Sequence, residues 1–436
     1  MFFYKQLKPL WHLKIGNQAL AVSDKTKRLF RWAQIYFFCL NCSNYLLRPV
    51  RDELVLHYEL SELPYFFTGT FACMLLLFPL LGRLNRLGNK HFLNILHWFF
   101  ISNLFIFWWL LLVFGNNYWV HLAFFGWTSV FNLLSISLGW GLITNLFDAQ
   151  QAKAFFVHIA LAGSLGGMAG SGIAFVGALF LAPLHLLLLG IGVLGVALWC
   201  IQVLHKARPA ITQRFSATKP PLELSKKDAQ HYIHQIAGLV LLYTLLATFL
   251  YFEQAHLLAY AQSNDVLIGI FQLNRTAILA LMALSINTFT LLLQLLVTKQ
   301  VLVQRGMDYI LSVVPSLLVI CLITLSFYPV LGVLLITQVV YKTGNYALMR
   351  PARETLFTLI SPDYKYRVKI WIDLIVYRGG DVLGSWLFMA CLTLFGLQIE
   401  MLTLVMIPMA YIWQRQGRNV GRLHEKLLLE KTRFKK

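Results

Sequence analysis

Residues 182–260 read APLHLLLLGIGVLGVALWCIQVL, then HKARPAITQRFSATKPPLELSKKDAQHYIHQ, then IAGLVLLYTLLATFLYFEQAHLLAY. Two apolar runs, 182–204 and 236–260, thus flank one polar stretch at 205–235. About 20 consecutive apolar residues are enough for a helix to cross the hydrocarbon layer of a bilayer. The polar stretch is the only long hydrophilic segment between apolar runs, so it divides the chain into two halves.

Apolar runs of this kind recur along nearly the whole chain. Of its 436 residues 58% are hydrophobic and 13% charged, and the mean hydropathy is +0.66. A soluble domain carries about 25% charged residues, so the excess apolar surface is expected to face lipid. We predict an all-α polytopic membrane protein with twelve transmembrane helices in two six-helix halves. The spans are expected near 31–54, 63–82, 92–114, 118–147, 153–180 and 182–204, and near 236–260, 271–298, 308–328, 329–350, 366–392 and 396–414.

Basic residues gather between these spans and give the chain a formal charge of +19. Lys and Arg accumulate on the cytoplasmic side of membrane proteins. With the N-terminus inside, all but five of the 37 fall in segments expected in the cytoplasm, so both termini are predicted to be cytoplasmic and no nucleic-acid partner is needed to explain the charge. Anionic membrane lipids are the expected partners of these residues. The domains are then a basic arm (1–30), an N-terminal half (31–204), a central loop (205–235), a C-terminal half (236–414) and a basic tail (415–436).

The five remaining basic residues lie within spans or at their far ends. Ionisable groups at membrane depth are costly, so they usually pair with one another or face a cavity. Structural ion pairs and snorkelling side chains are one interpretation, and an anion-binding cavity is the other. The five are Arg48, Arg51, Arg275, Lys342 and Arg378.

The first two arginines have a local pattern suited to anion binding. Arg48 and Arg51 are three apart, which puts them on one face of a helix, and Pro49 between them can kink that helix. Guanidinium groups suit phosphate and carboxylate oxygens because they donate two parallel hydrogen bonds. However, five acids lie near the five basic residues, so an anion site requires some acids to point elsewhere. These acids are Asp52, Glu53, Glu253, Asp373 and Asp381.

Glycines suggest close packing and a duplicated architecture. Two GxxxG registers, at 163–167 and 166–170, favour close helix approach, and Gly379 with Gly380 has the same effect beside Arg378. The run 152–155 (AKAF) is echoed by 368–371 (VKIW), and the same offset relates Gly163 to Gly379. The residues expected in packing and gating are Gly163, Gly167, Gly170, Gly379, Gly380, Lys153 and Lys369.

Motifs for bound groups and catalysis are absent from the sequence. No GxxxxGK[ST] loop occurs, the six cysteines have no metal-type spacing, and no nucleophile triad is present. We therefore predict no metal, no cofactor and no enzymatic activity.

Four stretches resemble one known family. NYLLRPVRDEL at 44–54, DAQQAKAFFVHIALAGSLGG at 148–167, NYALMRPARETLF at 345–357 and KYRVKIWIDLIVYRGGD at 365–381 are similar to the NTP/NDP exchange transporters, the ADP/ATP translocase family of the major facilitator superfamily. The resemblance is strongest to a bacterial branch whose substrate is not settled. It implies a major-facilitator-like fold, a bacterial inner-membrane location and ATP/ADP-type antiport with nucleotide binding.

The resemblance also carries over to single residues. Arg51 matches the family's basic residue of the first span, Arg378 that of the eleventh, and Glu253 the acid of the seventh. The family's acidic residue in the fourth span has no counterpart, because 128–132 is uncharged.

These observations predict alternating access, in which two halves rock about a central site. An anionic substrate is expected between Arg51 and Arg378, with Glu253 orienting it. The full set of expected substrate-binding residues is Arg48, Arg51, Glu253, Lys342, Arg378 and Asp381.

Other functions stay open at this point. The substrate can be another phosphorylated or carboxylated metabolite rather than a nucleotide. A membrane enzyme acting on lipid-linked substrates, or a receptor or scaffold, is the alternative of another class. The sequence leaves the oligomeric state, and the choice between exchange and proton coupling, undecided.

Overall fold

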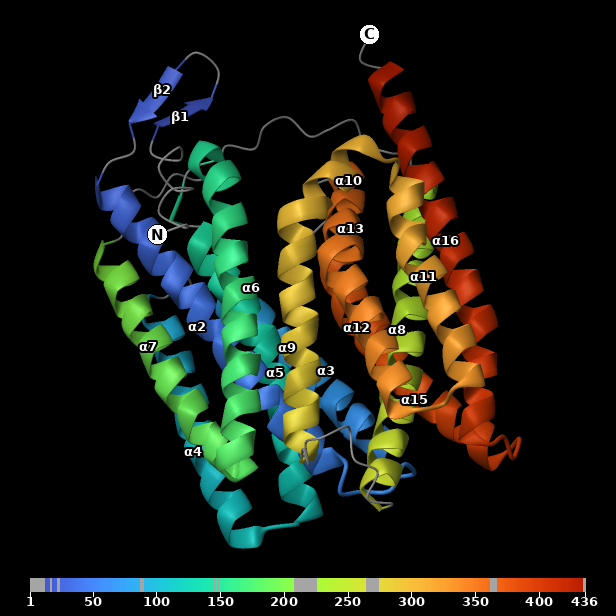
Figure 1. Cartoon of the computed structure of the whole chain (residues 1–436). Helices are drawn as coiled ribbons and strands as arrows, with labels where there is room; N and C mark the ends of the chain where they lie inside the picture. The colour runs from blue at the N-terminus through green and yellow to red at the C-terminus, as the bar shows by residue number, and fades with distance from the viewer. Residues whose placement is uncertain are drawn as a thin grey trace.

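The chain folds into a bundle of long helices (Figure 1). The computed structural model describes residues 12–15, 18–21, 24–86, 90–144, 146–147, 149–207, 226–263, 274–360 and 367–433. The N-terminal half contains α2 (Asp24–Val55), α3 (Leu63–Arg86), α4 (Lys90–Phe114), α5 (Tyr118–Thr144), α6 (Ala149–Phe180), η2 (Pro183–His185) and α7 (Leu186–Ala207).

The C-terminal half is built from more interrupted helices. Three of its segments are π-helical, a form that is rare and often found at functional sites. Its elements are α8 (Lys226–Ser263), α9 (Arg275–Leu293), η3 (Gln294–Thr298), α10 (Lys299–Gln304), α11 (Met307–Phe327), α12 (Leu331–Gly344), η4 (Asn345–Met349), α13 (Arg350–Leu356), η5 (Phe357–Leu359), η6 (Trp371–Val376), α15 (Tyr377–Thr393) and α16 (Ile399–Arg433).

Helices lie where spans were predicted, but several are longer than the apolar runs. The first begins at Asp24, inside the expected basic arm, and α16 continues to Arg433 through most of the expected tail. Helices continue past the apolar stretch because Lys, Arg, Gln and Glu, which are frequent there, are good helix formers. The arm also departs from the all-helical prediction, since β1 (His12–Ile15) pairs antiparallel with β2 (Gln18–Ala21).

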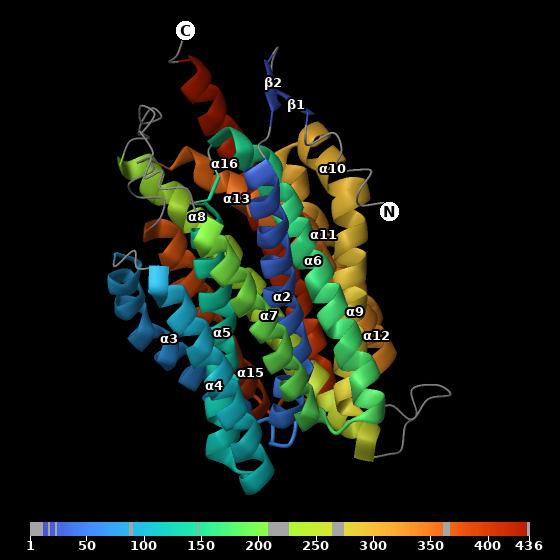
Figure 2. The ribbon, with the colours of Figure 1, turned by 90° about the vertical axis from the view of Figure 1, so that its left-hand side faces the viewer.

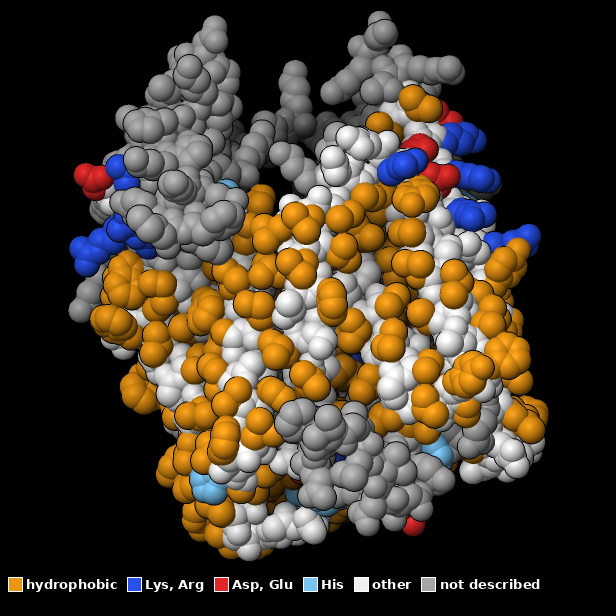
Figure 3. Space-filling view, viewed as in Figure 1, with side chains coloured by type: hydrophobic (Ala, Val, Ile, Leu, Met, Phe, Trp, Pro, Cys, Tyr) orange, Lys and Arg blue, Asp and Glu red, His pale blue; other side chains and the backbone are white. Residues whose placement is uncertain are grey.

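Seven helices among the described residues are long and apolar enough to cross a membrane. Large apolar side chains cover the face of the bundle seen in Figure 3. Others are strongly exposed in the same way, among them Leu76 (78% exposed) and Phe180 (80%). An outer surface of this kind requires lipid, so the chain is an integral membrane protein. The count of twelve spans stays a prediction.

Close helix contacts in the N-terminal half use the predicted glycines. A Cβ atom at Gly166 would overlap the backbone carbonyl of Phe38, and one at Gly170 would overlap that of Cys42. Thus α6 lies directly against the backbone of α2, side by side in Figure 2. The GxxxG registers act here as packing surfaces, as small residues do in other membrane helices.

The two halves meet along α6 and α9, which run antiparallel and exchange polar contacts. Ser164 Oγ donates to Gln294 Oε1 at 3.1 Å, and Asn287 Nδ2 donates to the Gly167 carbonyl at 3.3 Å. On another side, α15 packs against α3, and Trp386 Nε1 donates to Thr68 Oγ1 at 3.1 Å. Two clusters of buried apolar side chains form the core, one mainly from each half, but Val55, Phe66 and Phe125 join the C-terminal cluster and Ala280 joins the N-terminal one.

Candidate functional site

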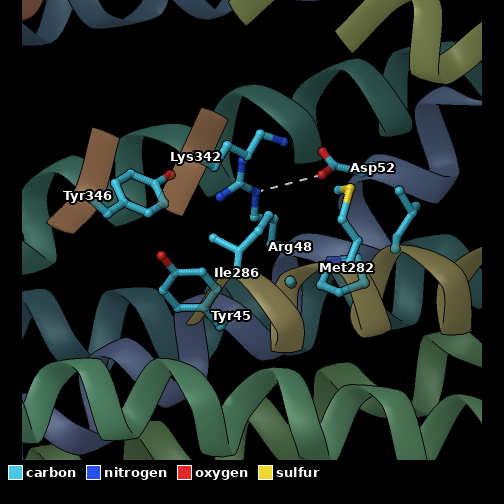
Figure 4. Close-up of a pocket in the computed structure, with 10 residues that line it drawn as sticks. Tyr45, Arg48, Asp52, Met282, Ile286, Lys342 and Tyr346 are labelled. Atoms are coloured by element: carbon cyan, nitrogen blue, oxygen red, sulfur yellow. Dashed lines mark ion pairs between the residues drawn. The ribbon is translucent and has the colours of Figure 1, made fainter. Parts of the chain in front are cut away.

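A small pocket lies where α2 of the N-terminal half faces α9, α12 and η4 of the C-terminal half (Figure 4). Its free volume is about 10 Å³, which is room for roughly one water molecule. A larger solute therefore requires the halves to separate from this arrangement. The lining residues are Tyr45, Arg48, Pro49, Asp52, Leu279, Met282, Ala283, Ile286, Lys342 and Tyr346.

The α2 wall of the pocket is charged. Asp52 lies between two arginines, with Arg48 Nε 3.7 Å from Asp52 Oδ2 and Arg51 Nη2 2.5 Å from Asp52 Oδ1. Helical spacing of four residues brings Arg48 and Asp52 together. The Arg51 guanidinium also lies over the Phe125 ring of α5, 4.8 Å from its centroid. Arg51 is therefore held just outside the pocket by Asp52 and an aromatic face.

The α9 wall is apolar. Leu279, Met282, Ala283 and Ile286 recur at intervals of three and four residues, so they form a single stripe on this helix. No charged side chain from this stripe reaches the pocket. A bound solute would therefore contact charge on one side and an apolar surface on the other.

The third wall carries the second basic residue of the pocket. Lys342 stands in the last turn of α12, and Tyr346 follows four residues later in the π-helical η4. Figure 4 shows Lys342, Tyr346 and Tyr45 of α2 around the end of the Arg48 side chain. Within the described part of the chain, no carboxylate lies within ion-pair distance of Lys342.

Most of the acids that would cancel this charge have other partners. Glu253 accepts a hydrogen bond from Thr403 of α16 at 2.7 Å. Asp381 pairs with Arg378 on its own helix at 3.3 Å.

The two other acids also lie away from the pocket. Asp373 Oδ1 is 3.2 Å from Arg353 Nη2. Glu53 is on α2 but does not line the pocket, and it lies within electrostatic reach of Arg275. Asp52 is thus the one carboxylate among the described pocket residues.

The structure brings together only some of the predicted substrate-binding residues. Arg48 and Lys342 line the pocket from opposite halves, and Arg51 joins them through Asp52. Arg378, Asp381 and Glu253 do not line it. The pairing of Arg51 with Arg378 around a substrate stays a prediction, and the pocket offers Arg48 with Lys342 as the pair from opposite halves.

The residues expected in packing and gating have varied surroundings. A Cβ at Gly163 would press on Phe37 and Asn41, one at Gly167 on Tyr45, and one at Gly380 on Thr244. The remaining positions are Gly379, which faces Phe71 of α3, and Lys369, which pairs with Glu354 at 2.6 Å. The side chain of Lys153 lies outside the described residues.

Sequence reasoning missed the tyrosines of the pocket. Tyr45 precedes Arg48 by three residues and Tyr346 follows Lys342 by four, so each shares a helix face with a basic residue. That spacing is a usable signal. The α9 stripe carries no such signal, because any buried helix shows the same pattern.

Comparison with known proteins identifies the fold. No family model matches the sequence, and no curated protein matches it. A solved auto-inhibited POT family peptide transporter aligns with a TM-score of 0.64 at 12% identity, covering 91% of this chain and 97% of that one. The nucleoside transporter NupG gives 0.64 at 12% identity, covering 90% and 99%. The human organic anion transporter MFSD10 gives 0.55 at 13% identity, covering 92% and 100%.

These similarities cover nearly the whole chain, although few residues are identical. They show that the chain has the fold of major-facilitator-type membrane transporters. The expectation of a major-facilitator-like fold is thereby confirmed.

Proposed function

We propose that this chain is an alternating-access transporter that carries an anionic solute through the pocket between its halves, with nucleotide exchange as the first substrate class to test. The observation that carries the proposal is the placement of Arg48 and Lys342. They come from opposite halves and line one pocket. A solute bound by both would be held by each half, as rocking about a central site requires.

Charge supports an anionic solute. Arg48, Arg51 and Lys342 lie around a single carboxylate, that of Asp52. The Coulomb energy of two unit charges 4 Å apart is about 4 kcal/mol at an effective dielectric constant of 20. An anion would offset the excess positive charge, so binding is favoured for phosphate or carboxylate groups.

The fold adds indirect support for the substrate class. Two proteins that share it are described as a nucleoside transporter and an organic anion transporter. Two of the four stretches that resemble nucleotide exchangers lie at the pocket. The stretch 44–54 contains Arg48, and the stretch 345–357 begins three residues after Lys342. Another phosphorylated or carboxylated metabolite would fit the same groups and is the runner-up substrate.

Counterflow in proteoliposomes tests the proposal. Vesicles that hold the purified protein are loaded with ADP, and uptake of labelled ATP is measured, followed by AMP, sugar phosphates and dicarboxylates with matching internal solute. We expect saturable uptake that depends on the internal anion. Absence of counterflow with every anion would contradict a carrier and would favour the enzyme or scaffold interpretations.

Two variants locate the site. Each charge-assisted hydrogen bond contributes about 1.5–3 kcal/mol, so Arg48→Gln and Lys342→Met should each lower uptake at limiting substrate at least about tenfold. Arg378→Gln compares this pocket with the predicted Arg51–Arg378 pair, because Arg378 pairs with Asp381 outside the pocket. If transport is lost in Arg378→Gln but kept in Arg48→Gln and Lys342→Met, Arg378 rather than the pocket residues binds the substrate.

A further inference from the structure

The start of α9 makes two hydrogen bonds to the other half of the molecule. We call the end of the bundle that holds Asp24 and Arg433 the terminal end, and the opposite end the distal end (Figure 1). Both contacts lie at the distal end. Arg275 Nη1 donates to the Leu56 carbonyl at 3.1 Å, and Asn274 Nδ2 donates to the Ala178 carbonyl at 2.7 Å.

Both acceptors lie at the C-terminal ends of helices. Leu56 directly follows α2, and Ala178 is in the last turn of α6. The last carbonyls of a helix have no partner within it and carry the negative end of the helix dipole. A guanidinium and an amide from the opposite half satisfy them here, where Ala178 is 2% exposed and Leu56 9%.

Asn274 serves two helices at once. Its Oδ1 accepts from the backbone N–H of Ala277 at 2.7 Å and so caps the N-terminus of its own helix, α9. Its Nδ2 group is not needed for that cap and is directed to α6 instead. One side chain therefore joins the beginning of a helix in one half to the end of a helix in the other.

The position of these contacts suits a part that opens. The polar contact between Asn287 and Gly167 lies farther along the same helix pair. Thirteen residues separate Asn274 from Asn287, which is about 20 Å along a helix. If the halves rock about the middle of α6 and α9, the distal contacts separate by the largest distance.

We propose that Asn274 and Arg275 form a latch that holds the halves closed at the distal end by capping helix C-termini of the opposite half. The latch must open each time the pocket faces the distal side. Opening replaces the two hydrogen bonds with bonds to water, so the net effect of each on the equilibrium is modest. The proposal rests on alternating access and on no particular substrate.

Two substitutions separate the latch from the helix cap. Asn274→Ser keeps an oxygen that caps α9 but removes the donor to Ala178. Arg275→Gln removes the charge at the end of α2. Each variant should change the ratio of distal-closed to distal-open molecules by about tenfold, while Arg418→Gln, an exposed arginine on α16, should leave it unchanged.

Distances between spin labels report the ratio. Double electron–electron resonance is recorded on full-length protein in nanodiscs, in a background with its native cysteines replaced. In both latch variants we expect the distal distance to lengthen and the terminal distance to shorten. Label pairs are placed at the exposed positions Asn116 and Phe395 for the distal end, and Asp24 and Gln304 for the terminal end.

Distance distributions that match the unmodified protein in both variants would overturn the latch. So would an equal change in Arg418→Gln. The measurement needs no substrate, so a protein that opens as expected but fails every counterflow assay would contradict the proposed function and leave the latch standing. Counterflow together with unchanged distances in both latch variants would overturn the latch and leave the proposed function standing.

Discussion

At the scale of single residues, the pocket depends on which acids are left near it. Five acids near five basic residues suggested an almost neutral cavity. The structure directs Glu253 to Thr403, Asp381 to Arg378 and Asp373 to Arg353. Glu53 does not line the pocket, which leaves Asp52 as the acid among the pocket cations. Asp52 is then the counter-ion that Arg48 and Arg51 hold when no anion is bound.

Asp52→Asn tests that role. Without the carboxylate, the substrate no longer competes with Asp52 for Arg48 and Arg51. The KM for the exchanged anion should therefore fall by about tenfold, which corresponds to about 1.4 kcal/mol of binding free energy. The maximal rate should also fall, because release then separates the anion from a more positive site. Concentration-dependent counterflow measures both values. Glu62→Gln, outside the pocket, is the control, and an unchanged or raised KM for Asp52→Asn would contradict the idea.

At the scale of the elements, glycines decide how closely helices approach. The backbone of α6 meets that of α2 at Gly166 and Gly170, where a Cβ would overlap carbonyl groups. A carbonyl of a paired helix cannot move aside as a flexible side chain can. The approach of these helices therefore needs glycine at both positions.

Gly170→Ala should destabilise the protein by about 1–3 kcal/mol, as overpacking does in other proteins. Gly192→Ala on α7 is the matched control, because a Cβ there would have no neighbour within 4 Å. Thermal unfolding of the purified variants in detergent measures the difference. Equal melting temperatures for both variants would show that α2 and α6 can move apart without a loss of stability.

The π-helical segments are a second feature at this scale. The predicted span 329–350 is divided between α12 and η4, and η4 carries Tyr346 of the pocket. Thr298 of η3 donates to the Ala347 carbonyl of η4 at 3.0 Å, so the two π-helical segments support one another. The position of η4 beside the pocket agrees with the tendency of such segments to occur at functional sites.

At the scale of the whole molecule, the main feature is that the first and last long helices have their outer ends on the same side of the bundle. The beginning of α2 and the end of α16 lie at the same end of the bundle (Figure 1). This arrangement is consistent with an even number of crossings. The excess of Lys and Arg predicts that this end faces the cytoplasm.

Fusion reporters in bacterial cells test the topology. Green fluorescent protein fused after Lys436 should fluoresce, since it folds in the cytoplasm. Alkaline phosphatase inserted after Asn116, at the distal end, should be active, since it needs an oxidising exterior compartment. An active phosphatase at the C-terminus would contradict the predicted orientation.

The apolar runs predicted where the helices lie, because the length of an apolar run decides whether it can cross a bilayer, while the division into two six-helix halves stays a prediction. The sequence also picked out the basic residues that topology leaves unexplained, Arg48 and Lys342 among them. Which of these basic residues meet depends on how the helices pack. Hydrophobicity places a helix in the membrane but does not fix its rotation or its neighbours. Packing at glycines and hydrogen bonds between halves fix both, and they bring Arg48 to Lys342 while Arg378 pairs on its own helix.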